Sequence, residues 1–249
     1  MSTRVAVVGA SGRMGRLAVG LIERDPDLQV AAEIGSSDPI DAIDGADVVL
    51  DLTVPAVSPG VVDAAIERGI PALVGTSGWT SERITALERK LAALPDQGVI
   101  IVPNFSLGSV LATRFAALAA PFFDSIEIVE SHHAGKVDSP SGTAIRTAEL
   151  MAAARTEAGP VSAPHADQRA RGQVVASIPV HSLRLSGVLA QQEVVFGGVG
   201  EVLRVSHETL SDASYEAGIL LGLRAAPDAR GVVVGLDALL DLGADASGS

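Results

Sequence analysis

The chain has 249 residues, of which 47% are hydrophobic and 19% charged, with a formal net charge of −12 and a pI near 4.7. This length can fill one large hydrophobic core or two smaller ones, and the acidic balance argues against a nucleic-acid partner because no basic stretch is present to neutralise phosphates. The lack of cysteine excludes disulfides, thiolate nucleophiles and cysteine-ligated zinc.

The sequence gives no sign of export or of membrane insertion. Met1–Arg4 lead directly into a predicted strand, without the apolar segment and cleavage site of a signal peptide. Apolar runs such as Val48–Leu50 and Val232–Val234 are too short to span a bilayer. We therefore predict a cytoplasmic protein with no membrane partner.

Residues 4–105 alternate short β-branched runs with helical patterns, which is typical of a doubly wound parallel sheet. The predicted strands are Arg4–Val8, Gln29–Ile34, Val48–Leu52, Ala72–Val74 and Val99–Val102. The predicted helices are Met14–Arg24, Ala56–Arg68 and Ser81–Leu94. The fold class is therefore α/β, with a Rossmann-type sheet in the first part of the chain.

A glycine-rich turn follows the first predicted strand and opens a helix. It consists of Gly9, Ala10, Ser11, Gly12, Arg13, Met14 and Gly15. The glycines permit a tight turn and let backbone N–H groups approach a pyrophosphate, while Glu33 at the end of the next strand can bind ribose hydroxyls. This context predicts a dinucleotide site. The alternative is a turn needed only for packing the strand against the helix.

Two further segments end strands at the same predicted edge of the sheet, where ligands bind in such folds. They are Gly75, Thr76 and Ser77, and Val102, Pro103, Asn104 and Phe105. Taken alone, the Gly-Thr-Ser turn is equally consistent with a structural role.

The charges near the dinucleotide turn predict which nucleotide is used. Glu33 would repel a 2′-phosphate, and no Lys or Arg lies between Arg24 and Arg68 to bind one. We therefore expect NADH to be preferred. Arg13 lies inside the glycine turn, where its guanidinium can reach a phosphate, so we expect NADPH to be accepted with modest discrimination.

After Ser106 the pattern changes to longer helices and antiparallel strands. The predicted strands are Gln173–Leu185, Val188–Phe196 and Glu201–His207. Residues 106–213 are thus predicted to form a smaller α+β substrate domain with a mixed or antiparallel sheet. A helical stretch follows at Tyr215–Leu223, and Gly243–Ser249 is predicted to be a frayed tail.

The run Glu130–Ala144 places two imidazoles and an ammonium in one short connection. Ser125–Glu130 is rich in β-branched residues and predicts a strand, so His132 and His133 lie where that strand stops. Lys136 is one of only two lysines in the chain. Unlike an arginine, a lysine supplies a compact ammonium that can give up its proton.

A helix start follows this connection. Pro140 precedes Ser141, which we predict to be the N-cap of a helix that continues through Gly142 and Thr143. Free backbone N–H groups and the positive end of the helix dipole favour an anion such as a carboxylate. The sequence therefore predicts proton donors and an anion-binding site within the same short segment.

The run resembles the signature of the dihydrodipicolinate reductase family, the 4-hydroxy-tetrahydrodipicolinate reductases of bacterial lysine and diaminopimelate synthesis. The resemblance covers nearly the whole chain. Besides Glu130–Ala144, it rests on Val7–Gly15, Val74–Gly78, Pro103–Ser106, Ile178–Arg184 and Glu193–Gly197.

The resemblance implies NAD(P)H-dependent reduction of 4-hydroxy-tetrahydrodipicolinate, a dicarboxylate, to tetrahydrodipicolinate. It makes His132 the general acid or base, Lys136 the second proton donor and His133 a substrate contact. It places a carboxylate cradle at Ser141, Gly142 and Thr143. It also implies that 214–249 completes the dinucleotide domain of 1–105, and that 106–213 assembles a homotetramer.

Other interpretations of these residues remain. In a purely structural interpretation, one imidazole packs in the core, the other is solvated, and Lys136 is a surface charge. A zinc site is not predicted, since adjacent histidines lack a third ligand at suitable spacing. We interpret Glu130 as a solvated strand end, with the orientation of an imidazole as the alternative. His181 and His207 are interpreted as structural and His165 as solvated.

Four positions depart from the family pattern. They are Leu52, Gly135, Gln191 and Asp212. Asp212 stands where an arginine is common, so we expect weaker substrate binding or a shifted specificity. The alternative functions are therefore a related imine or enamine reductase, or a catalytically silent nucleotide-binding protein.

Overall fold

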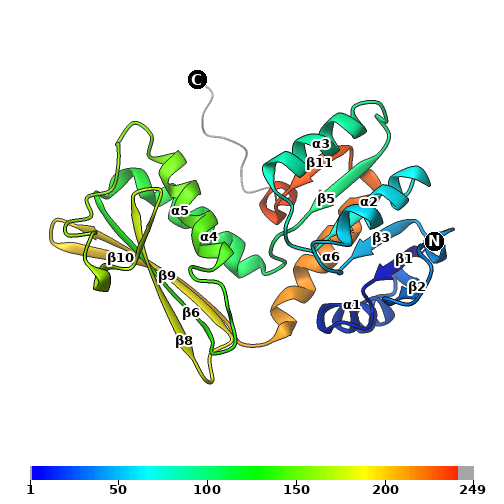
Figure 1. Ribbon diagram of the computed structural model, residues 1–249, viewed down its shortest axis with the longest axis horizontal. Helices are drawn as coiled ribbons and strands as arrows, with labels where there is room; N and C mark the ends of the chain where they lie inside the picture. The colour runs from blue at the N-terminus through cyan, green and yellow to red at the C-terminus, as the bar shows by residue number, and fades with distance from the viewer. Residues whose placement is uncertain (1, 241–249) are drawn as a thin grey trace. The chain divides into compact units, whose positions relative to one another are not determined.

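The computed structural model describes residues 2–240, and the predicted tail at Gly243–Ser249 lies outside the described residues (Figure 1). The described chain divides into two compact units. One runs up to Leu107 and resumes at Tyr215, and the other is Gly108–Ser214. The roles predicted for the two domains, nucleotide binding and substrate binding, stay predictions.

The first unit is built on a parallel sheet with the strand order β11-β5-β4-β3-β1-β2. The strands are β1 Thr3–Val8, β2 Leu28–Ile34, β3 Val48–Asp51, β4 Ala72–Val74, β5 Gly98–Ile101 and β11 Gly231–Val234. Because β1 lies between β2 and β3, the order of the strands reverses there, and ligands bind beyond the carboxyl ends of the strands at such a point. The predicted Rossmann-type fold is confirmed.

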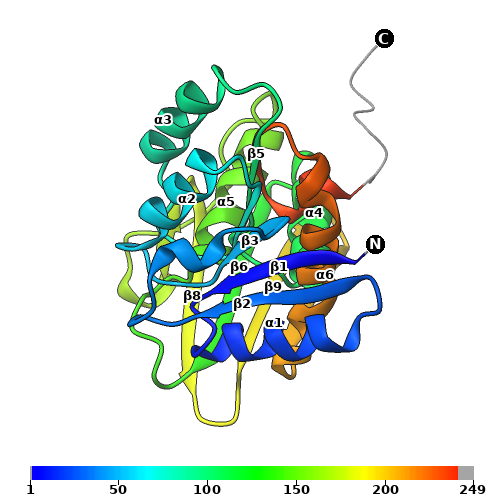
Figure 2. The same ribbon diagram turned by 90° about the vertical axis from the view of Figure 1, so that its right-hand side faces the viewer.

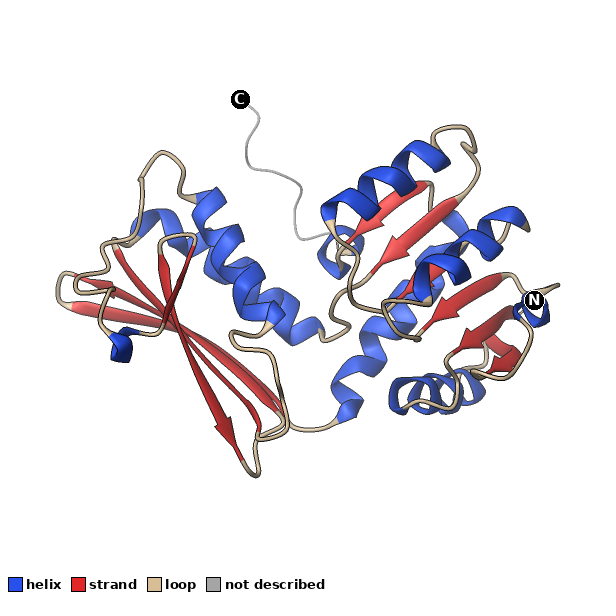
Figure 3. Ribbon diagram, viewed as in Figure 1, coloured by secondary structure: helices blue, strands red, loops and turns tan. Residues whose placement is uncertain are grey.

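Helices cover both faces of this sheet (Figure 3). They are α1 Arg13–Arg24, α2 Ser58–Glu67, α3 Ser81–Leu91 and α6 Glu216–Ala225. On one face Val61 of α2 and Leu87 of α3 share a core with Ala6 and Val49. Successive strand residues point to opposite faces. Leu73 accordingly meets Gly222 of α6 on the other face, where α6 also contacts α1 (Figure 2).

The second unit has a mixed sheet of order β10-β9-β6-β8-β7, in which only β6 and β8 pair in parallel. The strands are β6 Ser125–His133, β7 Gln173–Val175, β8 Ile178–Leu185, β9 Ala190–Gly198 and β10 Glu201–Thr209. Its long helices are α4 Leu107–Ala119 and α5 Gly142–Ala154. Both pack on one face of the sheet, where Ala116 and Met151 meet Ile126 and Phe196 (Figure 1).

Short 3₁₀ segments connect these elements. They are η1 Ile40–Ile43, η2 Ala120–Phe122, η3 Arg169–Arg171, η4 Asp212–Tyr215, η5 Ala226–Asp228 and η6 Leu236–Leu239. None of the helices within residues 2–240 combines the length and the apolar character needed to cross a bilayer.

The structure corrects two strand predictions. The single strand predicted at Gln173–Leu185 is two antiparallel strands, because Ala176 and Ser177 turn the chain with φ values of +48° and +71°. Non-glycine residues rarely adopt this conformation, so the sequence offers no turn signal there. The strand predicted at Ser125–Glu130 continues as β6 to His133, so both histidines lie within its end.

Candidate active site

The loops that follow the parallel strands leave the first sheet at one edge. The Gly9 N–H donates to the Ile34 carbonyl at 2.8 Å, and the Gly75 N–H donates to the Asp51 carbonyl at 2.9 Å. Each loop thus begins beside the end of a neighbouring strand. The structure therefore brings the three predicted segments, 9–15, 75–77 and 102–105, to the same edge of the sheet.

The glycine turn needs its glycines. Gly9 has a φ of +88°, and a Cβ there would lie 2.5 Å from the Leu52 carbonyl oxygen. A Cβ on Gly15 would lie 2.1 Å from the Gly9 carbonyl oxygen. Helix α1 begins with Gly12 as its N-cap, which offers no side chain to the first N–H groups. The start of α1 therefore carries no side-chain cap from Gly12, as suits a pyrophosphate site at a helix N-terminus.

The loop after β2 is acidic. Glu33 is exposed near the end of β2 and pairs in register with Val7 of β1. Asp38 accepts a hydrogen bond of 2.8 Å from the Gly35 N–H, a contact that sequence reasoning missed. The only feature of the sequence that indicated this contact was an aspartate three residues after a glycine. Two carboxylates therefore lie in the segment where a ribose is expected.

The remaining nucleotide-site candidates differ in exposure. Thr76, Val102 and Phe105 are buried, whereas Ser77 and Pro103 are exposed. Buried side chains pack the loops, and only their backbone groups can reach a ligand.

Gly75 and Asn104 shape these loops. A Cβ on Gly75 would lie 2.4 Å from the Phe105 ring and 2.7 Å from the Leu52 side chain. The Asn104 side-chain oxygen accepts a hydrogen bond of 2.9 Å from the Ser106 N–H. Leu52, one of the departures, thus packs beside the candidate loop.

A second group of functional side chains lies entirely in the second unit and centres on Glu130. The Glu130 side chain is 0% exposed, and its Oε2 lies 2.5 Å from His132 Nδ1. The Arg184 guanidinium donates to both Glu130 oxygens, at 2.9 and 3.0 Å. The Ser141 N–H donates to Oε1 at 3.2 Å. Interpreting Glu130 as a solvated strand end is therefore wrong, because the carboxylate is buried and holds the imidazole.

The sheet register explains this grouping. Glu130 and His132 are two residues apart on β6 and so share one face. His132 pairs with Arg184 of β8, which brings the guanidinium to the same place. The spacing of two residues between Glu130 and His132 already indicated in the sequence that the two side chains share a face of the strand. No role could be predicted for Arg184, which was recognised only as part of a family motif.

The pKa values of Glu130 and His132 both lie below their ordinary values, for different reasons. Burial alone would raise the pKa of the Glu130 carboxyl, but hydrogen bonds from Arg184, Ser182 and His132 outweigh it, and the pKa lies below its ordinary value. Burial lowers the pKa of His132, and the charges of Lys136 and Arg184 lower it further, so that Glu130 offsets only part of the shift. The carboxylate is therefore ionised and the resting imidazole neutral at neutral pH.

Lys136 and the start of α5 complete the group. The Lys136 ammonium lies 2.7 Å from the Asp138 carboxylate. Ser141 is the N-cap of α5, as predicted, and its Oγ accepts from the Ala144 N–H at 3.2 Å. Within residues 2–240 no hydrogen bond uses the N–H groups of Gly142 and Thr143. These donors are available to a carboxylate.

His133 is less closely tied to this group. It is exposed, and within the described chain no hydrogen bond joins its ring to His132. A Cβ on Gly135, another departure, would lie 3.4 Å from His133 Nδ1. Of the other departures, Gln191 pairs with Ser131 across β9 and β6, and Asp212 begins η4.

The other histidines have their own surroundings. His181 Nε2 lies 2.7 Å from Glu127, which also binds Arg171. His207 packs beside Gly108, and His165 is exposed.

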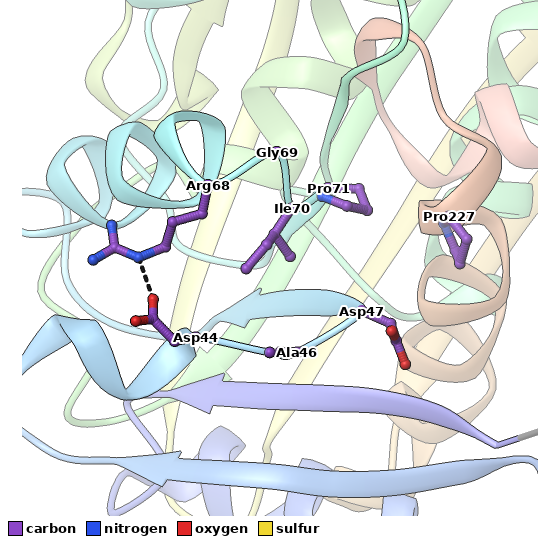
Figure 4. A pocket seen from close by; sticks show the side chains of 9 residues that line it. Asp44, Ala46, Asp47, Arg68, Gly69, Ile70, Pro71 and Pro227 are labelled. Carbon is purple, nitrogen blue, oxygen red and sulfur yellow. Dashed lines mark hydrogen bonds and ion pairs between the residues drawn. The ribbon is translucent and has the colours of Figure 1, made fainter.

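A surface pocket lies at the opposite edge of the first sheet (Figure 4). It is lined by the turns that precede β3 and β4 and by Pro227. Its cation, Arg68, is already paired with Asp44 at 2.6 Å and with Asp41. The Arg68 guanidinium is therefore not available to an anionic ligand, and the pocket lies away from the candidate loops. Within residues 2–240 no cluster of three or more His, Asp or Glu is placed to hold a metal ion.

Comparison with known proteins gives one family. The models for the N-terminal and C-terminal parts of dihydrodipicolinate reductase match residues 3–105 and 108–240. The 4-hydroxy-tetrahydrodipicolinate reductase of Clavibacter michiganensis is 62% identical over 97% of this chain and 87% of its own. That of Streptomyces coelicolor is 48% identical, over 96% of this chain and 98% of its own.

Solved structures agree with this family. A dipicolinate-bound dihydrodipicolinate reductase from Paenisporosarcina sp. is 30% identical and superposes with a TM-score of 0.84, covering 96% of this chain and 100% of that one. A myo-inositol dehydrogenase from Corynebacterium glutamicum, 16% identical with a TM-score of 0.58 over 93% of this chain and 90% of its own, shows the shared fold alone.

Proposed function

The chain belongs to the dihydrodipicolinate reductase family and is a pyridine-nucleotide-dependent reductase, and we propose that His132 and Lys136 supply the proton chemistry for reducing 4-hydroxy-tetrahydrodipicolinate. The reaction takes up one hydride and one proton, and the 4-hydroxyl leaves as water. A bound nicotinamide supplies the hydride, which no side chain can provide. The chain itself must bind the dicarboxylate and deliver the proton.

His132 is the proton donor in this proposal. Its Nδ1 is engaged by Glu130, which leaves Nε2 to exchange a proton with substrate. A lowered pKa makes the protonated imidazole a stronger acid, and a histidine near neutrality is a common general acid. The supporting observation is the buried Glu130–His132 pair beside the Lys136 ammonium.

The substrate carboxylates are bound at the start of α5. The free N–H groups of Gly142 and Thr143, the Thr143 hydroxyl and the Lys136 ammonium together offer donors for an anion. The exposed His133 ring is a further contact. Dipicolinate, the ligand named for the Paenisporosarcina relative, is a planar dicarboxylate of the kind that such donors suit.

The nucleotide is held at the carboxyl edge of the first sheet. The fit rests on the uncapped start of α1 and on the closeness of Gly9 to Leu52, which a side chain would block. The pyrophosphate lies against 9–14, the ribose against Glu33, and the nicotinamide end against 75–77 and 102–105. Because Glu33 and Asp38 are both acidic, NADH is the preferred nucleotide, and Arg13 allows NADPH to be used.

The second unit also forms a homotetramer, and the protein acts in the cytoplasm. Support for assembly comes from exposed apolar side chains on two strands of the mixed sheet, which are otherwise costly to leave in water. They are Leu183, Leu185, Val202 and Leu203. Light scattering behind size-exclusion chromatography measures the mass directly. The absence of cysteine from the sequence fits a reducing compartment such as the cytoplasm.

The test of this function is a coupled assay. Purified protein is mixed with NADH and with 4-hydroxy-tetrahydrodipicolinate generated enzymatically, and the loss of nicotinamide absorbance is followed. Substrate-dependent oxidation that is abolished by His132→Ala supports the proposal. Nucleotide binding without turnover would instead identify a catalytically silent relative, and turnover of only other imines would identify a different reductase.

A further inference from the structure

Glu130 is fully buried, although a carboxylate near the end of a strand could be solvated. Its Oε1 accepts hydrogen bonds from the Ser141 N–H and from Arg184, and its Oε2 accepts from Arg184 and lies against His132 Nδ1. Each oxygen is thus already bonded to the guanidinium. An ionised carboxylate has no proton to give, so the hydrogen bond to His132 requires the proton to lie on Nδ1.

We propose that Glu130 is a positioning residue that holds the His132 imidazole in its Nδ1–H form, with Nε2 directed to the substrate, and anchors it to the carboxylate-binding start of α5. This inference rests on the proposed role of His132. It adds a group that does not itself touch the substrate.

Arg184 and Ser141 explain why the carboxylate can do this. The two-pronged guanidinium of Arg184 keeps Glu130 ionised despite its burial, so the proton stays on the imidazole. Through the Ser141 N–H the same carboxylate is bonded to the residue that caps α5. One side chain therefore fixes both the ring that carries the proton and the helix start that holds the anion.

The charged groups around His132 determine its titration. Glu130 lies on its own strand, Arg184 on the neighbouring β8, and Lys136 in the following loop, where it is paired with Asp138. Glu130 raises the pKa of His132, whereas burial, Lys136 and Arg184 lower it. Removing the Glu130 charge is therefore expected to lower the pKa further.

The chain contains a matched control on the same strand. Glu127 binds His181 Nε2 at 2.7 Å and also binds Arg171, so it repeats the combination of carboxylate, imidazole and guanidinium. Neither His181 nor Arg171 belongs to the proposed site. Glu127→Gln removes the same charge with the same change of shape.

The test compares Glu130→Gln with Glu127→Gln by ¹⁵N NMR of the histidine rings and by kinetics. A glutamine has a single acceptor oxygen, which Arg184 and Ser141 occupy, so its amide N–H₂ faces His132. We expect the ring to change to its Nε2–H form and its titration midpoint to fall. Turnover is expected to fall about 10²-fold, and its loss at high pH to begin at a lower pH. Glu127→Gln is expected to keep the His132 signals and the turnover of the wild type.

Two results overturn the proposal. One is a His132 ring in Glu130→Gln that keeps both its Nδ1–H form and its wild-type titration midpoint. The other is an equal change in both variants. If Glu130→Gln does not fold, Glu130→Asp replaces it. It retains the charge, so the Nδ1–H form is expected to persist with partly reduced turnover, and an Nε2–H ring there also overturns the proposal.

Failure of the proposed function is distinguishable from failure of this inference. Wild-type turnover in His132→Ala would refute the role of His132 in the reaction. The NMR comparison needs no substrate, and it still decides whether Glu130 sets the form of the ring.

Discussion

The Lys136 ammonium lies 2.7 Å from the Asp138 carboxylate, in the loop between β6 and α5. The hydrogen bond from Lys136 is the largest cause that lowers the pKa of Asp138. The Asp138 side chain is 54% exposed and that of Lys136 only 21%, so the pair restrains a lysine that is largely covered. Lys136 is thereby held close enough to His132 for its positive charge to lower the pKa of the imidazole.

Removing either proton donor is expected to stop most turnover. His132→Ala and Lys136→Ala are each predicted to lower kcat by about 10²–10⁴-fold, the usual contribution of general acid–base catalysis. NADH affinity is expected to stay nearly unchanged, because the nucleotide candidates belong to the first unit. Steady-state kinetics and nucleotide titration measure the two effects separately. Wild-type turnover in the double variant would contradict the assignment.

Planar dicarboxylates are expected to compete with the substrate. Dipicolinate can use both the start of α5 and the Lys136 ammonium, whereas the monocarboxylate picolinate can use only one of them. Inhibition by dipicolinate is therefore predicted to be stronger and to weaken as salt is added. Inhibition constants at two ionic strengths test this. Equal inhibition by the two compounds would rule out two carboxylate sites.

NADH is expected to give the higher kcat/KM. Glu33 and Asp38 repel a 2′-phosphate, and Arg13 only partly offsets them. Arg13→Ala is predicted to increase the preference for NADH, and Glu33→Gln to reduce it. Measuring kcat/KM with both nucleotides for the three proteins decides the question. A strong NADPH preference that survives Arg13→Ala would mean that the adenosine pocket is misplaced.

The N-cap of α5 is expected to contribute to both stability and binding. Ser141→Ala is predicted to cost about 1 kcal/mol of unfolding free energy, because the Ala144 N–H loses its acceptor. Thr80→Ala is the control, since Thr80 caps α3 in the same way with the Arg83 N–H. Both variants are expected to lose stability in urea, but only Ser141→Ala to raise the KM for substrate. An equal KM for both would separate the cap from the anion site.

Acid is expected to destabilise the protein partly through Glu130. Its pKa in the folded protein lies below the ordinary value of 4.5, so its contribution is complete above pH 4.5 and is lost as the pH falls through the folded value. Glu130→Ala is predicted to cost about 3–5 kcal/mol at neutral pH, because the Arg184 charge loses its partner. The difference from wild type is expected to shrink in acid. Urea unfolding between pH 7 and pH 3 measures it, and a constant difference would exclude this linkage.

Local signals in the sequence predicted the parts of the fold and site that depend on neighbouring residues. Gly15 is required by its contact with the Gly9 carbonyl in the same turn, and the cap at Ser141 follows from a hydrogen bond three residues along the chain. The short β-branched runs located the parallel strands of residues 4–105 to within a few residues.

Features that depend on distant residues could not be predicted in this way. Arg184 is 54 residues from Glu130, and only the register of β6 with β8 joins them. A carboxylate at a strand end looks solvated until that partner is known. The turn at Ala176 and Ser177 was missed because positive φ values at non-glycine residues leave no compositional trace.

The strand order of the first sheet has a consequence for synthesis of the chain. β11, at the edge of that sheet, pairs with β5, yet the whole of Gly108–Ser214 lies between them in the sequence. During translation the second unit therefore leaves the ribosome complete, while the first still lacks α6 and β11. Domains generally fold as units as they emerge. We expect the mixed-sheet unit to reach its native structure first, and the nucleotide-binding unit to close only near the end of synthesis.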